Sequence, residues 1–384
     1  MSKYKIAVLG AGNGGLTFAG DLALAGHTVN LWEPPQFKEN IEPIQKAGHI
    51  EMRGVAREGL ARLNLVTTDA NEALDGVKVI IAATPAYGHV AFAEAIAPHL
   101  QEGQMVILNP SYGLGQVEFA NTLKKKGANL KKVLLGATGI LPYATRKYMG
   151  YKVFCWRVKA KIPFSAFPAT NTAKMLPVLN EIYAQDDGER GILVDSINDL
   201  KMSLETINLF AHPPMMILNA VDCELGEEPE LKSEDSHAVR MLSRAMNREA
   251  MAITKSFGLE PWPNEYVESV MMYPYWINRP RQVDKPEWAK PENQPTEYAA
   301  GRGFNFLKGR YLTEDIPYGL VPISQLGDMV GISTPCIDGV IDIGSVISEA
   351  DYRKTGRTLE KLGLAGMNKT ELVNYVTYGD AKAS

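Results

Sequence analysis

Three glycines near the start of the chain have the spacing of a phosphate-binding turn. Gly10, Gly12 and Gly15 take the first, third and sixth places of the run Gly-Ala-Gly-Asn-Gly-Gly. In such a turn the first glycine permits a tight bend, the second lets the backbone approach a pyrophosphate, and the third allows close packing of a helix on a sheet. The N–H groups at the start of that helix then face the negative charge. The sequence therefore predicts dinucleotide contacts at these glycines and at Asn13 and Gly14.

An acidic residue strengthens this interpretation. Glu33 follows an apolar run at 28–32 and lies about twenty residues beyond the turn, where a carboxylate accepts hydrogen bonds from a ribose 2′-OH and repels a 2′-phosphate. The next residues, Pro34, Pro35 and Gln36, bring no arginine. NAD is therefore the expected cofactor, with NADH preferred and NADP still allowed. The alternative is that Glu33 is a solvated strand end.

Two further loops are expected at the same cleft. Thr84 and Pro85 follow one apolar run, and Asn109 follows another. Loops at the carboxyl ends of parallel strands line the nucleotide cleft of open α/β sheets. We therefore expect these three residues to contact the cofactor, although Asn-Pro is also a common turn former.

Reduction of a carbonyl or imine also needs a group that exchanges a proton near neutral pH, and histidine is the usual choice. Of the six histidines, His212 differs because it lies in an apolar helical stretch at 208–219. Pro213 and Pro214 follow it and are expected to kink or start a helix there. On these residues alone, a histidine satisfied within the core explains the pattern as well as a catalytic one.

The elements that must position these residues alternate in the first half of the chain. Short apolar or β-branched runs typical of buried strands occur at 4–9, 28–32, 77–83, 105–108 and 133–135. Helical patterns separate them at 16–24, 91–100 and 117–123. This alternation predicts an α/β fold in which residues 1–198 form a Rossmann domain with a doubly wound parallel sheet.

The pattern changes after about residue 200 to long helices with few strand candidates. The expected helices are at 204–225, 238–257, 264–277, 323–330 and 337–347. A polar, proline-containing stretch at 279–310 is typical of a long loop, either functional or disordered. Residues 199–384 are therefore predicted to form an all-helical substrate domain.

Length and composition agree with a two-domain protein outside the membrane. A chain of 384 residues exceeds what one hydrophobic core usually serves. No apolar run approaches the ~20 residues that span a bilayer, and the N-terminus lacks a secretory pattern, so a cytoplasmic location is expected. The three cysteines form no Cys-x-x-Cys pair, which favours neither disulfides nor a metal site. A net charge of −4 offers no case for binding nucleic acid.

Three segments together carry a resemblance to a known family. They are Asn208-x-x-x-His212-Pro213, the block from Arg310 to Pro322, and the C-terminal run at 351–364. This combination resembles the opine dehydrogenases of the octopine and nopaline type over nearly the whole chain. The resemblance implies an oxidoreductase that joins the amino group of an amino acid to the keto carbon of a 2-oxo acid, commonly pyruvate. The product is a secondary-amine dicarboxylate, and the reverse oxidation is implied as well.

The resemblance also assigns roles to residues. His212 and Asp315 match the acid/base pair of the family, in which a carboxylate on one ring nitrogen sets the tautomer and stabilises the imidazolium. Arg310 matches an arginine whose planar guanidinium suits a substrate carboxylate, although it could instead brace Glu314.

Thr138 and Trp276 are expected contacts of the amino-acid substrate, and for Trp276 a place in the core is an equal alternative. The expected partners are therefore two small molecules, not nucleic acid or membrane, with a homodimer allowed. The identity of the amine stays open.

Two rival functions fit part of the sequence. A glycerol-3-phosphate or ketopantoate reductase would share the first domain and use a lysine near the start of the helical domain, where Lys201 lies. The pairing of His212 with the Arg310–Asp315 block fits those enzymes poorly. A non-catalytic nucleotide-sensing protein is the alternative of another class, but retention of both acid/base residues argues against it.

Overall fold

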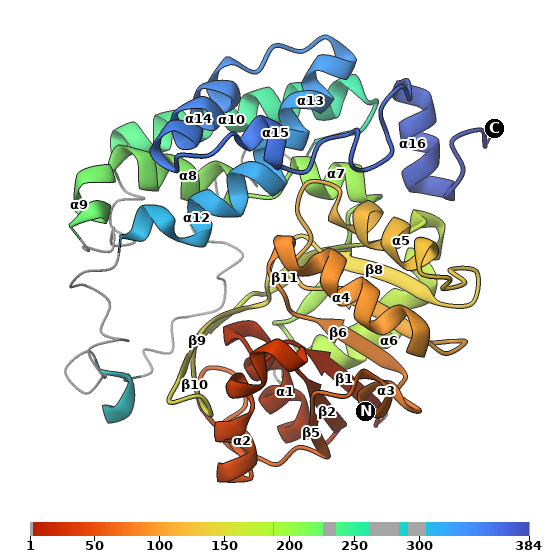
Figure 1. Cartoon of the computed structure of the whole chain (residues 1–384), viewed down its shortest axis with the longest axis vertical. Helices are drawn as coiled ribbons and strands as arrows, with labels where there is room; N and C mark the ends of the chain where they lie inside the picture. Colours follow the sequence, from red (N-terminus) through yellow and green to blue (C-terminus); the bar gives the residue numbers. More distant parts are fainter. Residues whose placement is uncertain (1–2, 187, 226–235, 262–283, 291–304, 384) are drawn as a thin grey trace. The chain divides into compact units, whose positions relative to one another are not determined.

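The computed structural model describes residues 3–186, 188–225, 236–261, 284–290 and 305–383 (Figure 1). The chain divides into two compact units. The first comprises Met1–Ser111, Gln116–Ser196 and Tyr273–Asn293, and the second comprises Tyr112–Gly115, Ile197–Met272 and Gln294–Ser384. The change of unit after Ser196 lies close to the boundary expected at residue 198.

An eight-stranded sheet forms the core of the first unit, in the order β12-β11-β8-β7-β6-β1-β2-β5. Its strands are β1 (Lys5–Leu9), β2 (Thr28–Trp32), β5 (Leu65–Thr67), β6 (Val79–Ala82), β7 (Met105–Leu108), β8 (Leu134–Thr138), β11 (Lys161–Phe167) and β12 (Ile192–Asp195). All neighbouring pairs are parallel except β8 with β11. The expected doubly wound sheet is confirmed, with this antiparallel pair as an addition.

The strand order places a topological switch point at β1. This strand pairs with β2 on one side and with β6 on the other, and the chain runs outward through β2 to β5 before it crosses to β6. The helices and turns of this unit include α1 (Asn13–Leu24), η1 (Pro35–Asn40), α2 (Glu42–Ala47), α3 (Ala70–Leu74), α4 (His89–Ile96), α5 (Gly115–Lys125) and α6 (Thr172–Tyr183). Ligands of open α/β sheets bind at the carboxyl edge beside such a switch point.

A second, four-stranded sheet was not predicted from the sequence. It has the order β4-β3-β10-β9, with β3 (Ile50–Gly54), β4 (Gly59–Ala61), β9 (Tyr143–Tyr148) and β10 (Lys152–Val158). Polar residues such as Thr145, Arg146 and Lys147 interrupt the apolar pattern of β9, so hydrophobic periodicity does not reveal it. Strand β9 packs against α1, the helix that follows the glycine turn.

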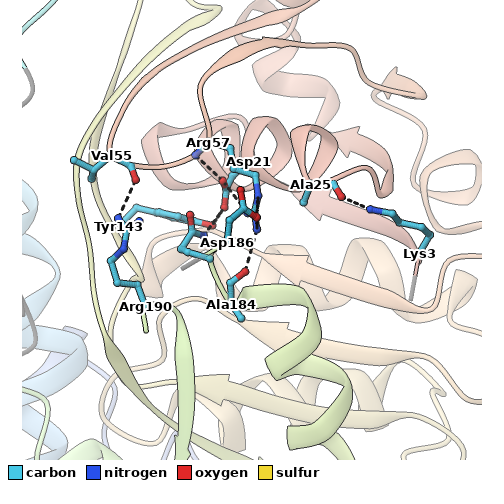
Figure 2. Close-up of polar contacts among 10 residues, drawn as sticks. Lys3, Asp21, Ala25, Val55, Arg57, Tyr143, Ala184, Asp186 and Arg190 are labelled. Carbon is cyan, nitrogen blue, oxygen red and sulfur yellow. Dashed lines mark hydrogen bonds and ion pairs between the residues drawn. The ribbon is translucent and has the colours of Figure 1, made fainter. Parts of the chain in front are cut away.

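A buried carboxylate ties α1 to this second sheet (Figure 2). Asp21 is 1% exposed and accepts hydrogen bonds from the Tyr143 hydroxyl at 2.8 Å and from Gln185 Nε2 at 2.9 Å. Arg57 Nη1 lies 3.1 Å from Asp21 Oδ1, and its Nη2 lies 2.8 Å from Asp186 Oδ1. Burial and the Asp21 charge raise the pKa of Tyr143, which keeps the phenol a hydrogen-bond donor. This network holds α1 at its middle.

The second unit contains only helices and connecting segments among its described residues. They are α7 (Asp199–Leu204), α8 (Asn208–Leu218), α9 (Ala220–Glu224), α10 (His237–Ser256), the 3-10 helix η9 (Phe306–Lys308), α12 (Arg310–Thr313), the π-helix η10 (Ile316–Leu320), α13 (Val321–Val330), α14 (Pro335–Ile347), α15 (Tyr352–Thr355) and α16 (Lys369–Tyr378). The helical domain is confirmed. None of the described helices has the length and apolar character needed to cross a membrane.

One expected helix is divided in the structure. Residues 204–225, predicted as one helix, instead lie in α7, α8 and α9. The breaks fall at 205–207 and at Asn219, whose φ of −121° and ψ of 31° leave the helical region. The Thr206 hydroxyl donates to the Met202 carbonyl at the first break, a local bond of the kind that competes with helix continuation. The helix expected at 264–277 lies outside the described residues.

Candidate functional site

The glycine turn follows β1 and has the steric form of a phosphate-binding loop. Gly10 has a φ of +98°, and a Cβ there would lie 2.7 Å from the Ala83 carbonyl oxygen. A Cβ on Gly15 would lie 1.8 Å from the Gly10 carbonyl oxygen. A Cβ on Gly12, by contrast, would meet no atom within 4 Å. The first and last glycines are thus required by the protein itself, whereas the space above Gly12 is open to a ligand, as a bound dinucleotide requires.

The loop after β6 lies against this turn. The Ala83 carbonyl is the group that a Cβ on Gly10 would strike, so the two loops are in close contact at the switch point. Thr84 is buried, and a Cβ on Gly88 would lie 2.3 Å from its hydroxyl oxygen. Pro85 is partly exposed. The structure therefore places both expected residues beside the glycine turn, with Pro85 the more accessible.

Asn109 and Thr138 form a buried cluster at the carboxyl ends of β7 and β8. Thr138 is 0% exposed, and its hydroxyl donates to Asn109 Oδ1 at 3.1 Å. The Tyr183 hydroxyl donates to the same oxygen at 3.0 Å. Thr138 was expected to touch the amino-acid substrate, but it has no exposed surface to offer. Its contact positions the Asn109 side chain and the loop that follows β7.

The expected ribose-binding carboxylate sits in a hydrogen-bonded cluster. Glu33 is 6% exposed, its Oε2 accepts from the Ala11 backbone N–H, and its Oε1 accepts from Asn40 Nδ2 at 2.9 Å. Burial raises the pKa of Glu33, while these hydrogen bonds and the charge of Lys147 oppose the rise. Glu33 is therefore not a solvated strand end.

Lys147 and Asn40 are members of this cluster that the sequence analysis did not identify. Lys147 Nζ donates to the Ala11 carbonyl and to Asn40 Oδ1, both at 3.0 Å. The Lys147 backbone N–H donates to Asn13 Oδ1 at 2.9 Å. Asn13, expected at the cofactor, thus joins the glycine turn to β9. No local sequence signal marks Lys147, because the packing of β9 against α1 brings it to the turn.

The proposed acid/base residues meet within the second unit. His212 Nδ1 on α8 lies 2.7 Å from Asp315 Oδ2, directly before η10. Their side chains are 19% and 4% exposed. A carboxylate bonded to Nδ1 selects the ring tautomer and supports positive charge on the imidazole. Proton exchange with a bound molecule then falls to Nε2.

Close packing of η10 on α8 makes this contact possible. A Cβ on Gly319 would lie 2.2 Å from Leu209 Cδ2, so a larger residue would push η10 away from α8. π-helical turns are rare and occur often at functional sites. Pro213 and Pro214 lie inside α8, which continues through them from Asn208 to Leu218.

Aromatic residues complete the surroundings of the histidine. The Tyr311 ring stacks on the His212 ring with centroids 3.9 Å apart and planes at 25°. Asn208 Nδ2 donates to the Tyr112 hydroxyl at 3.3 Å. Burial raises the pKa of Tyr112, and the charges of Asp315 and Glu314 raise it further. Neither tyrosine was identified from the sequence, although the position of Tyr311 beside Arg310 was a usable signal.

Arg310 is an exposed residue of the second unit with an acidic neighbour. Arg310 Nη1 lies 3.4 Å from Glu314 Oε2, and the Arg310 side chain is 56% exposed. It therefore contacts Glu314, the partner that the alternative interpretation named, while its side chain stays largely exposed to solvent. Lys201, the residue on which a rival function depended, is buried and ion-paired with Glu205. Trp276 lies outside the described residues.

Two family models match the chain. Residues 197–348 match the alpha-helical domain of NAD/NADP octopine/nopaline dehydrogenases. Residues 5–133 match the N-terminus of NAD-dependent glycerol-3-phosphate dehydrogenases. The second match agrees with the expectation that the rival reductases share the first domain.

Curated relatives match over nearly the full length. An opine dehydrogenase of Arthrobacter sp. (strain 1C) is 34% identical over 94% of this chain and 95% of its own. An octopine dehydrogenase of Pecten maximus is 23% identical over 88% of each chain.

Solved structures share the fold. Octopine dehydrogenase with NADH and pyruvate superposes with a TM-score of 0.68 at 20% identity, covering 98% of both chains. Yersinopine dehydrogenase with NADP⁺ gives a TM-score of 0.63 at 15% identity, covering 98% of both chains. A ketopantoate reductase from Ralstonia eutropha gives 0.56 at 17% identity, covering 90% of this chain and 98% of that structure.

Proposed function

Since this chain belongs to the opine dehydrogenase family, we propose that it joins the amino group of an amino acid to the keto carbon of pyruvate and reduces the resulting imine with NADH. It is an NAD(P)-dependent oxidoreductase that acts on CH–NH groups. Residues 1–198 are assigned to the dinucleotide and residues 199–384 to the substrates.

The contact between His212 and Asp315 carries the chemical part of the proposal. Condensation of amine and ketone releases water and leaves a C=N bond, and the bound cofactor supplies a hydride to its carbon. The imine nitrogen then takes up one proton, which we assign to His212 Nε2. Asp315 on Nδ1 stabilises the imidazolium before that transfer. In the reverse oxidation His212 Nε2 accepts the proton from the substrate nitrogen.

The binding roles follow from charge and exposure. Arg310 is assigned to a substrate carboxylate, because its guanidinium is largely exposed and matches the planar geometry of that group. The glycine turn and Glu33 are assigned to the pyrophosphate and the ribose, with Pro85 at the nicotinamide side. Asn109 is 2% exposed and is assigned to holding the loop that carries this side of the cleft. Thr138 enters as a positioning residue through Asn109. Trp276 keeps its proposed contact with the amino acid.

Two features of the proposal concern the protein as a whole. A cytoplasmic location is proposed. The three free cysteines support it, because a reducing compartment keeps thiols from forming disulfides. A homodimer is proposed as the oligomeric state, and sedimentation velocity at micromolar concentration tests it. A single sedimenting species of 42.2 kDa would exclude the dimer.

The test of the reaction is NADH oxidation with pyruvate and a panel of amino acids. We expect turnover only when the 2-oxo acid and an amine are both present, with a secondary-amine dicarboxylate as the product in mass spectrometry. Equal rates with and without the amine would identify a ketone reductase and refute the proposal. Binding of NADH without turnover for every pair tested would instead support the nucleotide-sensing alternative.

A further inference from the structure

The tertiary fold places an ammonium group beside the carboxylate assigned to the ribose. Asn40 accepts from Lys147 Nζ at 3.0 Å through Oδ1 and donates to Glu33 Oε1 at 2.9 Å through Nδ2. One amide side chain therefore links the two charges. Lys147 Nζ also donates to the Ala11 carbonyl, inside the glycine turn. The cation thus lies at the nucleotide site itself and not only on the surface of the second sheet.

The two charges have opposite effects on a phosphorylated ribose. A carboxylate at the end of the second strand accepts hydrogen bonds from the 2′-OH and repels a 2′-phosphate. An ammonium group one side chain away attracts that phosphate, which is a stronger partner for lysine than the neutral amide of Asn40. The exposed Glu39 carries a further negative charge, which interacts electrostatically with both Glu33 and Lys147.

We propose that Lys147 is a second determinant of cofactor selectivity, offsetting the charge of Glu33 and binding the 2′-phosphate of NADPH. Cofactor choice then depends on the balance between Glu33 and Lys147, and not on Glu33 alone. The inference rests on the proposed nucleotide site at the glycine turn. It adds to that site a residue from β9, more than a hundred positions further along the chain than Glu33.

The Lys147 side chain can be tested without removing its backbone contact. Its N–H donates to Asn13 Oδ1, and this bond is independent of the side chain. Lys147→Met therefore removes the charge while the backbone contact between β9 and the turn is retained. Lys152→Met is the matched control, because Lys152 lies on the neighbouring strand β10 and pairs with Glu51 instead.

The experiment measures the dissociation constants of NADH and NADPH by cofactor fluorescence, without substrates. We expect Lys147→Met to weaken NADPH binding about 10- to 160-fold, the contribution of one hydrogen bond to a charged group, and to change the dissociation constant of NADH by less than about threefold. Glu33→Gln should strengthen NADPH by a similar factor, and Glu33→Gln/Lys147→Met should lose that gain. Lys147→Arg should retain the wild-type affinity for NADPH, and Lys152→Met should change neither constant.

Three results would overturn the inference. Equal weakening of NADH and NADPH in Lys147→Met would show that the side chain only supports the turn. Unchanged NADPH affinity in that variant would show that Lys147 does not reach the phosphate. Failure of the wild-type protein to bind either cofactor would refute the nucleotide site together with the inference. Because the measurement is binding, absence of amine-dependent turnover would refute the proposed reaction alone.

Discussion

Replacing the two members of the His212–Asp315 pair tests whether they act as one unit. General acid/base groups contribute about 10²- to 10⁴-fold to rate, so His212→Ala should lower kcat by that range. The 2.7 Å contact is a charge-assisted hydrogen bond once the imidazole is protonated. Such a bond contributes about 1.5–3 kcal/mol, which corresponds to about 10- to 160-fold in rate. Asp315→Asn should therefore cost less than His212→Ala.

The stability of the same variants should follow a different order. His212→Ala leaves a carboxylate that is 4% exposed without its partner, and an unsatisfied buried group costs about 1–3 kcal/mol or more. The additional change Asp315→Asn removes that buried charge. The double variant should therefore be more stable to denaturant than His212→Ala alone, yet no more active. Residues that act as one unit are non-additive, so its kcat should be close to that of His212→Ala.

The assay is steady-state turnover with NADH, pyruvate and the preferred amine, combined with NADH binding and urea denaturation. NADH affinity should be nearly unchanged, because the glycine turn belongs to the other unit. His237→Ala is the control, since this exposed histidine begins α10 of the same unit. Wild-type turnover in His212→Ala would remove this histidine from the mechanism. Fully multiplicative losses in the double variant would mean two independent roles.

Three further predictions concern the first unit. Gly12→Ala should fold like the wild type but bind NADH weakly. Gly15→Ala should lower the free energy of unfolding, because a Cβ on Gly15, unlike one on Gly12, meets the backbone. Fluorescence titration of NADH and urea denaturation separate these two effects. Asp21→Ala should lower the free energy of unfolding by about 3 kcal/mol, because it leaves the largely buried Arg57 side chain without this ion-pair partner. Urea denaturation at pH 7 measures the loss. Burial lowers the pKa of Lys159 to about 7 in the folded protein. Between pH 7 and 10 the unfolded chain therefore binds more protons at Lys159 than the folded chain does, so the free energy of unfolding should rise with pH. Lys159→Met should flatten that rise in denaturation curves at pH 7 and 9.

Local patterns were sufficient to predict the elements and the nucleotide turn. Strand and helix periodicity, together with the run from Gly10 to Gly15, are properties of short segments, because they depend on backbone angles and on which faces are apolar. The sequence therefore predicted β1, α1 and β2 and the helical second half of the chain. Its residues alone left His212 undecided between core and catalysis, and only the likeness to a family selected Asp315 as its partner.

Tertiary structure alone decided which distant residues meet. Lys147 reaches Glu33 through Asn40 because β9 packs on α1, and β9 is too polar for its strand to be predicted. Tyr143 reaches Asp21 through the same packing. Such contacts depend on how whole elements pack, because the residues that form them are far apart in the sequence. No pattern within a short segment relates one of them to the other. Sequence periodicity therefore predicted the strands and the helix that form the nucleotide site, and tertiary packing determined which charged residues surround it.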